Sequence, residues 1–374
     1  MILTLMVTKT TNSGSITFPN EYVFAFNPNY IDFNLDSSIY SVEVSVASST
    51  KEFNITCSLY KGKGKCYISR MLQLLFDDDY LTHRVEEATI AVLNNGENIG
   101  QTTLTIMWGC IRLGDPFGLG EVLGKFKQEQ SVIERKTITF YRETKWFKKF
   151  PCSISFFAPS GSKDLKATID GGKETVVDIG NQPAILDVQP SADAKNQIIY
   201  SIAVDKEAIA STFPFVFDDT FGKSYQYTQE KVRVIVSDET EGYYIRWIDQ
   251  FGFIQYWLFK KGTSTSKNKL GSNTKPIKKQ LNGIYYGNIE RVTHIDSTET
   301  VKCAAVGLNE NMLRTVETII KSPYVDLFLG YNQKNEEVWL PINVVAGSYK
   351  VSQKKVLQDY EIQFTMPDTA SQTL

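Results

Sequence analysis

The segment Gly242-Tyr-Tyr-Ile-Arg-Trp-Ile-Asp-Gln-Phe-Gly-Phe-Ile-Gln-Tyr-Trp-Leu-Phe259 decides how the fold is interpreted. It places eight aromatic residues and two glycines within eighteen positions. Two runs of β-favouring residues, Tyr243–Ile248 and Phe253–Phe259, flank a connector that starts with Asp249 and ends with Gly252. Aspartate often opens a turn and glycine accepts a positive φ, so the pattern predicts a β-hairpin.

Large apolar side chains fall on both faces of this predicted hairpin. Such a hairpin has to be covered on both sides, by a core and by a second layer or a neighbouring subunit. We therefore predict that its aromatic residues form a packing or interface element. These residues are Tyr243, Tyr244, Trp247, Phe251, Phe253, Tyr256, Trp257 and Phe259.

The sequence on either side of the hairpin repeats short β-favouring runs separated by Asn, Gly, Pro and Ser. Strands spaced roughly ten residues apart, with no helical periodicity between them, are typical of β-sandwiches and barrels. The predicted fold class is mostly β, with two or three sandwich-like or barrel-like domains. Their predicted ranges are 1–130, 131–237 and 238–374.

Two segments predict short helices within this β-rich chain. In 69–76, Ser69 stands at the N-cap position and the apolar residues that follow share one stripe. In 310–321, Asn309 is a suitable N-cap and Pro323 ends the helix.

The tract 260–279 is rich in lysine, serine, threonine, asparagine and glycine. It has little to bury, so we predict a flexible loop or arm. Its lysines are predicted to interact with a neighbouring subunit that orders the loop, or with phosphate or an acidic glycan. The lysines concerned are Lys260, Lys261, Lys267, Lys269 and Lys275.

Composition places the chain among ordinary soluble globular proteins, with 42% hydrophobic and 22% charged residues. A formal net charge of -2 argues against general affinity for nucleic acid or anionic membranes. No window approaches the roughly 18 apolar residues that a membrane span needs. The apolar start, Met1–Thr8, alternates like a strand and is interpreted as one rather than as a signal peptide.

Five cysteines, an odd number, are spread widely over the chain: Cys57, Cys66, Cys110, Cys152 and Cys303. This pattern predicts free, mostly buried thiols in a reducing compartment. Cys57 and Cys66 flank a predicted hairpin turn, so a cross-strand disulfide between them is the alternative.

The chain lacks the residue patterns of common catalytic and cofactor sites. Neither His83 nor His294 has a second histidine or cysteine at metal-ligand spacing. The glycine-rich segment 113–120 is followed by Lys125, but no hydroxyl residue comes directly after this lysine as in a phosphate-binding loop. We therefore predict a protein that is not an enzyme, with no catalytic, cofactor-binding or metal-binding residues.

Several segments resemble tail-region virion structural proteins of phages and prophages of Bacteroidetes. They are Tyr243–Gly252 with Tyr256–Phe259, Tyr67–Phe76, Ile320–Phe328, and Trp339–Asn343 followed by Tyr360–Phe364. The resemblance implies a distal-tail, baseplate or tail-ring building block that works as a closed homo-oligomer. Its partners would be copies of itself and other tail proteins, and it would be made in the bacterial cytoplasm and located in the virion tail.

Two alternatives from other functional classes remain open at this point. The first is a carbohydrate-binding adhesin or receptor-recognition protein in which Trp247, Trp257 or Trp339 stacks on a sugar. The second is a glycan-degrading enzyme, which needs two carboxylates across a cleft. If the hairpin is a packing element, changing Trp247 to alanine impairs folding or assembly rather than ligand affinity.

Overall fold

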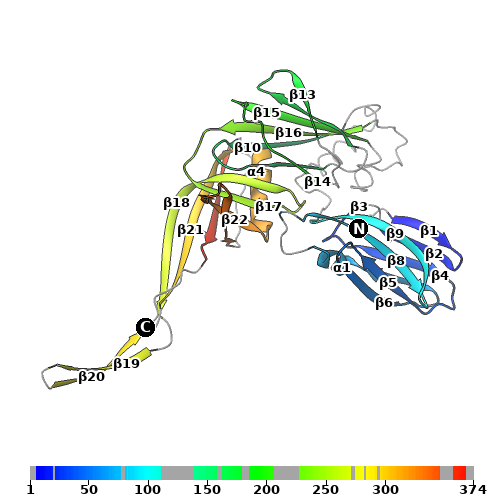
Figure 1. Ribbon diagram of the computed structural model, residues 1–374, viewed down its shortest axis with the longest axis horizontal. Coiled ribbons are helices and arrows are strands. Elements are labelled where there is room, and N and C mark those ends of the chain that lie inside the picture. The colour runs from blue at the N-terminus through cyan, green and yellow to red at the C-terminus, as the bar shows by residue number, and fades with distance from the viewer. Residues whose placement is uncertain are drawn as a thin grey trace. The chain divides into compact units, whose positions relative to one another are not determined.

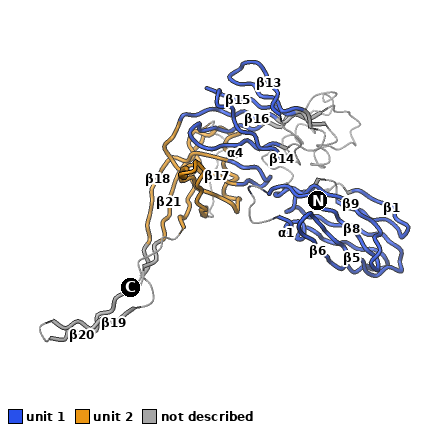
Figure 2. The backbone as a smooth tube through the Cα atoms, viewed as in Figure 1, with its two compact units in different colours: residues 1–238, 248–255 blue, residues 239–247, 256–374 orange. Residues whose placement is uncertain are grey.

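The computed structural model describes residues 6–19, 22–76, 81, 83–110, 138–157, 162–178, 185–205, 227–270, 274–281, 284–292, 295–345 and 357–367. These residues are mostly in strands, with short helices, which confirms the predicted fold class. The chain forms two compact units, residues 1–238 with 248–255, and residues 239–247 with 256–374 (Figure 2). The domain boundary predicted near residue 130 lies outside the described residues.

The N-terminal part of unit 1 is a β-sandwich of two sheets (Figure 1). The four-stranded sheet has the order β1-β2-β4-β7, with β1 (Met6–Thr11), β2 (Gly14–Pro19), β4 (Tyr30–Leu35) and β7 (Lys63–Tyr67). The five-stranded sheet has the order β3-β9-β8-β5-β6, with β3 (Tyr22–Phe24), β5 (Ser41–Ala47), β6 (Glu52–Ser58), β8 (Val85–Asn94) and β9 (Glu97–Met107). Most of these strands follow the predicted β-favouring runs.

The core of the sandwich follows from alternation along its strands. On β4, Ile31 and Phe33 are buried, and on β5 Val44 and Val46 are buried. Side chains alternate between the two faces of a strand, so these apolar residues share the inner layer. Each such side chain, fully buried, stabilises the fold by about 1.5–3 kcal/mol before conformational entropy is counted.

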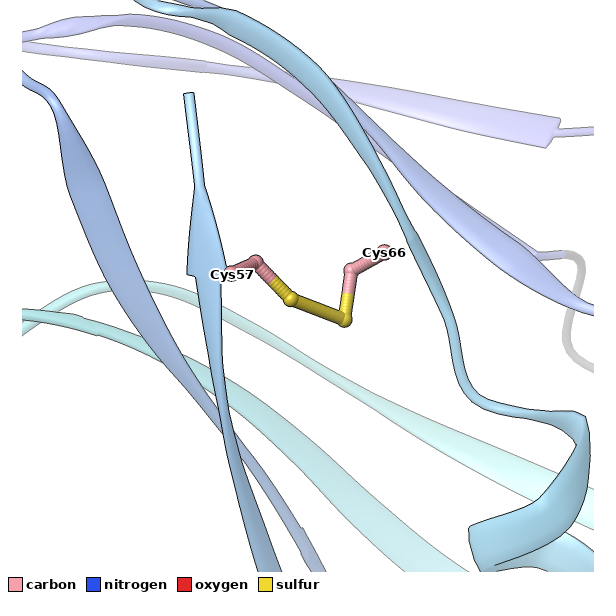
Figure 3. Close-up of a disulfide and its surroundings, with 2 residues drawn as sticks. All are labelled: Cys57 and Cys66. Atoms are coloured by element: carbon pink, nitrogen blue, oxygen red, sulfur yellow. A yellow bond between two sulfur atoms is a disulfide. The ribbon is translucent and has the colours of Figure 1, made fainter.

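A disulfide joins Cys57 to Cys66, with their Cα atoms 6.0 Å apart (Figure 3). Cys57 lies on β6 and Cys66 on β7, so the bond connects the two sheets rather than neighbouring strands of one hairpin. The prediction of free thiols is therefore wrong for this pair, although it holds for Cys110, Cys152 and Cys303. Sequence spacing alone could not show that the chain changes sheets between the two cysteines.

The first helix, α1 (Ser69–Leu74), forms where the sequence predicts one, but its first residue acts differently from the prediction. Ser69 is not the N-cap, because Ile68 occupies that position and no side chain caps the helix. The Ser69 hydroxyl instead donates to the carbonyl oxygen of Asn27 at 3.0 Å and accepts from the amide of Asn29 at 2.8 Å. These contacts fix the loop before β4.

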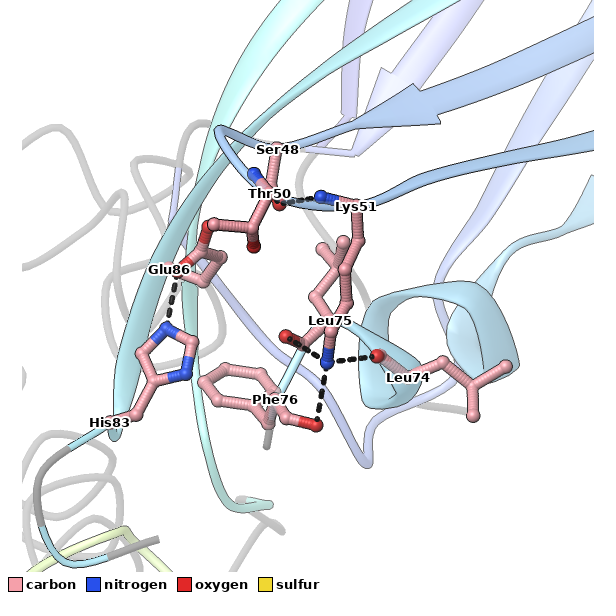
Figure 4. Close-up of polar contacts among 8 residues, drawn as sticks. All are labelled: Ser48, Thr50, Lys51, Leu74, Leu75, Phe76, His83 and Glu86. Carbon is pink, nitrogen blue, oxygen red and sulfur yellow. Dashed lines mark hydrogen bonds and ion pairs between the residues drawn. The ribbon is translucent and has the colours of Figure 1, made fainter. Parts of the chain in front are cut away.

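A lysine closes the other end of α1 (Figure 4). The Lys51 ammonium donates to the carbonyl oxygens of Leu74, Leu75 and Phe76, at 3.1, 3.1 and 3.3 Å. A cation at this end satisfies carbonyls that have no partner in the helix and complements the helix dipole. The turn that carries Lys51 is held by the Ser48 hydroxyl, which accepts from the amides of Thr50 and Lys51.

The middle part of unit 1 has a five-stranded sheet of order β10-β16-β15-β12-β13 and a two-stranded sheet of β11 and β14. Their bounds are β10 (Ile138–Phe147), β11 (Ile154–Phe157), β12 (Ser162–Ile169), β13 (Glu174–Val177), β14 (Ile185–Val188), β15 (Gln197–Asp205) and β16 (Tyr227–Ser237). The β10–β16 pair is parallel, which strand periodicity does not reveal. Phe156 and Tyr200 meet edge to face, with their ring centroids 5.6 Å apart.

Unit 2 is built on a seven-stranded sheet of order β23-β22-β17-β18-β21-β25-β24. Its strands are β17 (Tyr243–Ile248), β18 (Ile254–Leu270), β21 (Ile295–Leu308), β22 (Val325–Tyr331), β23 (Glu337–Pro341), β24 (Asn343–Val344) and β25 (Gln358–Thr365). A separate hairpin pairs β19 (Thr274–Leu281) with β20 (Ile284–Val292).

The second predicted helix is confirmed as α4 (Glu310–Val316), which continues as the 3₁₀ helix η2 (Glu317–Lys321). Asn309 is its N-cap, and the Asn309 side chain accepts from the amide of Met312 at 2.9 Å. Met312, Val316 and Ile319 are buried along one side. The capping residue and the apolar stripe both lie within this segment, so local sequence was enough to predict it.

The lysine-rich tract 260–279 is not a loop along most of its length. Residues 260–270 continue β18 and pair antiparallel with β21, from Lys260 opposite Ala304 to Leu270 opposite Ile295. Thr274 begins β19. The prediction of a loop assumed that a segment with few apolar residues does not adopt a fixed conformation. A backbone ladder satisfies its polar groups without a core, and threonine favours the extended conformation.

Candidate interaction surfaces around the aromatic hairpin

The aromatic hairpin has the turn that its sequence predicts. The amide of Asp249 donates to the carbonyl oxygen of Phe253 at 2.9 Å, and the amide of Gly252 donates to that of Asp249 at 3.1 Å. Gly252 has φ +81°. A Cβ atom there would lie 2.3 Å from the carbonyl oxygen of Trp108, so both the backbone conformation and the space require glycine.

The eight aromatic residues predicted as a packing or interface element divide into two groups. Six of them are 3% exposed or less: Tyr244, Trp247, Phe251, Phe253, Trp257 and Phe259. Tyr243 and Tyr256 are only half-buried. Because these six aromatic side chains are already buried within a single chain, they pack internally and do not contact a partner. A role at a subunit interface stays a prediction for Tyr243 and Tyr256.

One face of the hairpin packs inside unit 2 against the helical segment. The indole nitrogen of Trp247 donates to the Thr318 hydroxyl on η2 at 2.9 Å. The ring of Trp247 also lies 6.4 Å from that of Phe259. On the same sheet Tyr243 contacts Phe364 of β25 edge to face at 5.5 Å. This face is therefore a core layer, closed by η2.

The other face carries a cluster of rings with one ion pair. Tyr244 stacks on Tyr256 with centroids 6.0 Å apart, and Phe328 and Trp339 lie 5.0 Å apart beside them. The Arg246 guanidinium is centred 4.0 Å from the Trp339 ring, within the range of a cation–π contact. These contacts occupy the Trp339 ring, which is half-buried.

Arg246 also pairs with a buried carboxylate across the two strands. Its Nε atom donates to Oδ2 of Asp326 at 2.9 Å. Burial raises the pKa of the Asp326 carboxyl, whereas the hydrogen bond and the charge of Arg246 lower it. The arginine thus stabilises the charged form of an aspartate that has lost most of its water.

The burial of Trp247, Trp257 and Trp339 tests whether each of them can stack on a sugar. Trp247 and Trp257 are 0% and 1% exposed, so neither can stack on a sugar in the folded chain. Trp339 keeps some exposure, but Arg246 lies over its ring. Trp247 and Trp257 are therefore not stacking platforms.

The tip of the hairpin belongs to unit 1 and holds a buried carboxylate. Oδ1 of Asp249 accepts from the amides of Phe251 and Phe253 at 2.9 and 3.0 Å, and Oδ2 accepts from Nε2 of Gln255 at 2.9 Å. Burial raises the pKa of Asp249 from 3.8 to about 6, although these hydrogen bonds and the charge of Arg142 act in the opposite direction.

We expect Asp249 to make stability fall as the pH rises. Its pKa is higher in the folded chain than in the unfolded chain, so its contribution is largest below 3.8 and is lost as the pH rises to about 6. When the pH rises from 5 to 7, the titration of Asp249 should lower the free energy of unfolding by about 1 kcal/mol. Urea unfolding of the wild type and of Asp249→Asn at both pH values measures the difference. An equal pH dependence in both proteins would contradict the prediction.

A second set of polar groups holds the backbone of the tip within unit 1. Nη1 of Arg84 donates to the carbonyl oxygen of Gly252 at 2.8 Å, and Nη2 pairs with the carboxylate of Asp187. The Ser155 hydroxyl donates to that carboxylate at 2.5 Å and accepts from the amide of Ile254 at 3.1 Å. Sequence reasoning missed Arg84, Ser155 and Asp187, because they lie far from the tip along the chain and form no local motif.

The extension of β18 and β21 forms a two-stranded segment, called here the ribbon (Figure 1). It consists of Ser264–Leu270 paired with Ile295–Val301. The next strand, β25, pairs with β21 only from Thr300 onward, so most of the ribbon has two strands among the described residues. Consecutive side chains from 264 to 267 are all exposed, so both faces of this part of β18 are open.

Of the five lysines predicted to interact, Lys260 and Lys261 precede the ribbon on β18, Lys267 and Lys269 lie on it, and Lys275 lies on β19. Lys260, Lys261 and Lys267 are exposed. Lys269 lies in β18 and Lys275 in β19, and their side chains are outside the described residues. On the ribbon itself, the Ser264 hydroxyl donates to the Glu299 carboxylate at 2.5 Å, so the two strands are also joined by side chains.

Few of the remaining described residues are candidates for catalysis or metal binding. His83 contacts the Glu86 carboxylate (Figure 4), while His294 and the glycine-rich segment 113–120 lie outside the described residues. In the part of the chain that the structure describes, no group of three or more His, Cys, Asp or Glu residues could hold a metal ion. Across the same residues, no helix is both long and apolar enough to cross a membrane.

The fold and these surfaces define a β-rich protein of two compact units, with an aromatic hairpin buried in its interior and an exposed ribbon. No protein-family model matches the chain, and no curated protein sequence matches it.

Proposed function

We propose that this chain is a structural building block of a phage tail or tail-like particle, of the ring, distal-tail or baseplate type, and that it acts through contacts between subunits. The ribbon carries the proposal, because it is a two-stranded segment whose side chains at 264–267 are exposed on both faces. The hairpin and C-terminal segments resemble tail-region virion proteins, and this resemblance is the reason for proposing a phage tail or tail-like particle.

The physical argument starts from the stability of a two-stranded segment. At about 3.4 Å per residue, the ribbon extends for roughly 20 Å. An isolated pair of strands is marginally stable in water and gains stability when another surface covers it. A neighbouring subunit supplies such a surface in a closed ring. The ribbon therefore serves as the element that reaches the next copy.

Charge favours a second copy as the partner of the ribbon. The segment 260–281 contains seven lysines and no acidic residue. The whole chain has a formal net charge of -2, so the rest of it carries -2 - 7 = -9. Exposed acidic residues are present at Asp238, Glu239 and Glu241. The basic segment 260–281 on one copy, which includes the β18 strand of the ribbon, can thus meet an acidic surface on another.

The test is the oligomeric state of the full chain, measured by gel filtration with light scattering and by electron microscopy. We expect closed oligomers for the wild type. Lys260→Glu, Lys261→Glu and Lys267→Glu together should convert them to smaller species, because the variant replaces three exposed positive charges on β18, at and next to the ribbon, with negative ones.

The matched control reverses three exposed lysines elsewhere, Lys149, Lys173 and Lys195, and should leave the oligomer intact. A strictly monomeric wild type, together with phage particles that lack the protein, would contradict the proposal. Equal dissociation of the two triple variants would show that net charge, rather than the ribbon, governs assembly.

A further inference from the structure

An open groove of about 540 Å³ lies on the N-terminal sandwich of unit 1, away from the hairpin and the ribbon in sequence. It is formed by β4, β7 and the turn that precedes β7. The residues that line it are Asp32, Tyr60, Lys61, Lys63, Gly64 and Lys65. Three lysines and one aspartate give the groove a formal charge of 3 - 1 = +2.

The side chains of the groove point outward because of strand alternation. On β7, Cys66 is buried, whereas Lys63, Lys65 and Tyr67 are exposed. Tyr60 and Tyr67 are 77% and 65% exposed, which is high for aromatic residues. Exposed tyrosines beside lysines form a surface with apolar ring faces and positive charges together.

The lysines are arranged around these rings. The Lys65 ammonium lies 4.3 Å from the centroid of the Tyr30 ring and 3.7 Å from the Asp32 carboxylate. The Lys61 ammonium lies 5.5 Å from the centroid of the Tyr60 ring. The Lys65–Asp32 pair is at the surface, with side chains 46% and 44% exposed, so an incoming anion can replace the aspartate at little cost.

The turn that carries Tyr60 and Lys61 is held in one conformation. Lys61 and Gly62 have φ 51° and 73°, the combination of a type I′ hairpin turn. Such turns favour asparagine followed by glycine, so a lysine at the first position is unusual. A Cβ atom at Gly62 would lie 2.2 Å from the carbonyl oxygen of Leu35, which shows how closely the turn packs on β4.

The disulfide joins the two ends of the segment 57–66, which contains this turn. Cys57 and Cys66 bracket the turn and the first part of β7, so the bond ties the groove to both sheets of the sandwich (Figure 3). A binding site that is fixed before its ligand arrives loses less conformational entropy on binding. The covalent closure therefore pre-organises the lysines and Tyr60.

We propose that this groove binds a segment of acidic polysaccharide, in which sugar rings carry carboxylate or sulfate groups. The Tyr60 ring stacks on the apolar face of a sugar, and the lysines pair with the anionic groups of the chain. Lys63 and Lys65 point to the same side of β7, about 7 Å apart. The groove has a formal charge of +2 on a chain of net charge -2. This small positive charge matches a polysaccharide with a few spaced anionic groups better than a nucleic-acid backbone, which carries a charge on every phosphate. The proposal uses no residue of the ribbon, so it stands independently of the proposed function.

The experiment titrates the full chain with four probes by calorimetry: polygalacturonate for carboxylates, heparin for sulfates, neutral dextran, and single-stranded thymidine oligonucleotide. Binding of either anionic glycan, weakened by salt and stronger than that of dextran and the oligonucleotide, is expected. Which of the two binds more tightly identifies the anion.

Two sets of variants locate the site. Lys61→Gln, Lys63→Gln and Lys65→Gln together should weaken glycan binding by about tenfold or more. The same change at Lys149, Lys173 and Lys195 removes equal charge from exposed positions and should change affinity by less than about twofold. Tyr60→Phe keeps the ring and should bind, whereas Tyr60→Ala should not.

The disulfide gives an independent readout. Cys57→Ser with Cys66→Ser should weaken glycan binding while circular dichroism shows an intact β-sandwich. If that variant fails to fold, the two lysine triples decide the question, since their side chains are exposed. Equal weakening by the two triples, or tighter binding of the oligonucleotide or of dextran than of both glycans, would overturn the proposal.

Discussion

Replacing Trp247 with alanine is expected to lower the free energy of unfolding by about 4 kcal/mol, within the range for truncating a buried tryptophan. The side chain is 0% exposed and is among the largest fully buried side chains of the protein. The substitution leaves a cavity between the sheet of unit 2 and η2 and removes the hydrogen bond to Thr318. Urea unfolding, followed by tryptophan fluorescence and circular dichroism, measures the loss.

Two further variants separate the parts of this effect. Trp247→Phe keeps most of the buried apolar area and loses the indole nitrogen, so about 1–2 kcal/mol is expected. Thr318→Val removes the acceptor of the indole nitrogen and also the hydrogen bond that the Thr318 hydroxyl donates to the carbonyl oxygen of Thr315 at 2.7 Å, so about 1–2 kcal/mol is expected. If Trp247→Ala unfolds within 1 kcal/mol of the wild type, the hairpin is not a packing element of unit 2.

The second large effect is expected from Arg84→Ala, which should destabilise unit 1 by about 3 kcal/mol. The Arg84 side chain is 8% exposed and binds both the Asp187 carboxylate and the carbonyl oxygen of Gly252. Its removal leaves a partly buried carboxylate without its cation and a buried carbonyl without its donor. Thermal and urea unfolding provide the measurement.

Lys166→Ala is the control for Arg84→Ala. Lys166 pairs with Glu174 at 2.9 Å, but both side chains are about half exposed, at 47% and 50%. Exposed pairs contribute about 0.2–1 kcal/mol, so this variant should be close to the wild type. A similar loss of stability in both variants would show that burial does not distinguish the two pairs.

Local patterns predicted several elements correctly because the forces behind them act over a few residues. The hairpin turn depends on Asp249 and Gly252, which lie within four residues of each other. The helix at 310–321 depends on the Asn309 cap and on apolar spacing within the same segment. In each case the interaction that fixes the conformation is between neighbours in sequence.

Other features were missed or misassigned because distant residues decide them. Ser69 resembles an N-cap, yet its hydroxyl binds the backbone about forty residues earlier. The lysine-rich tract resembles a loop, yet the complementary edge of β21 makes it a strand. Neither partner can be identified from the segment itself.

Local patterns are enough to predict a mostly β chain, the aromatic hairpin with its turn, and the α4 helix, because alternation, turn residues and caps act locally. The tertiary structure shows what covers each face of the hairpin: η2 on one side and the ring cluster around Tyr244 on the other. It also determined that Cys57 and Cys66 connect two sheets, and that Arg84, Ser155 and Asp187 meet at the hairpin tip. These features depend on residues separated by long stretches of chain, whose approach follows from packing of the whole unit and not from any local pattern.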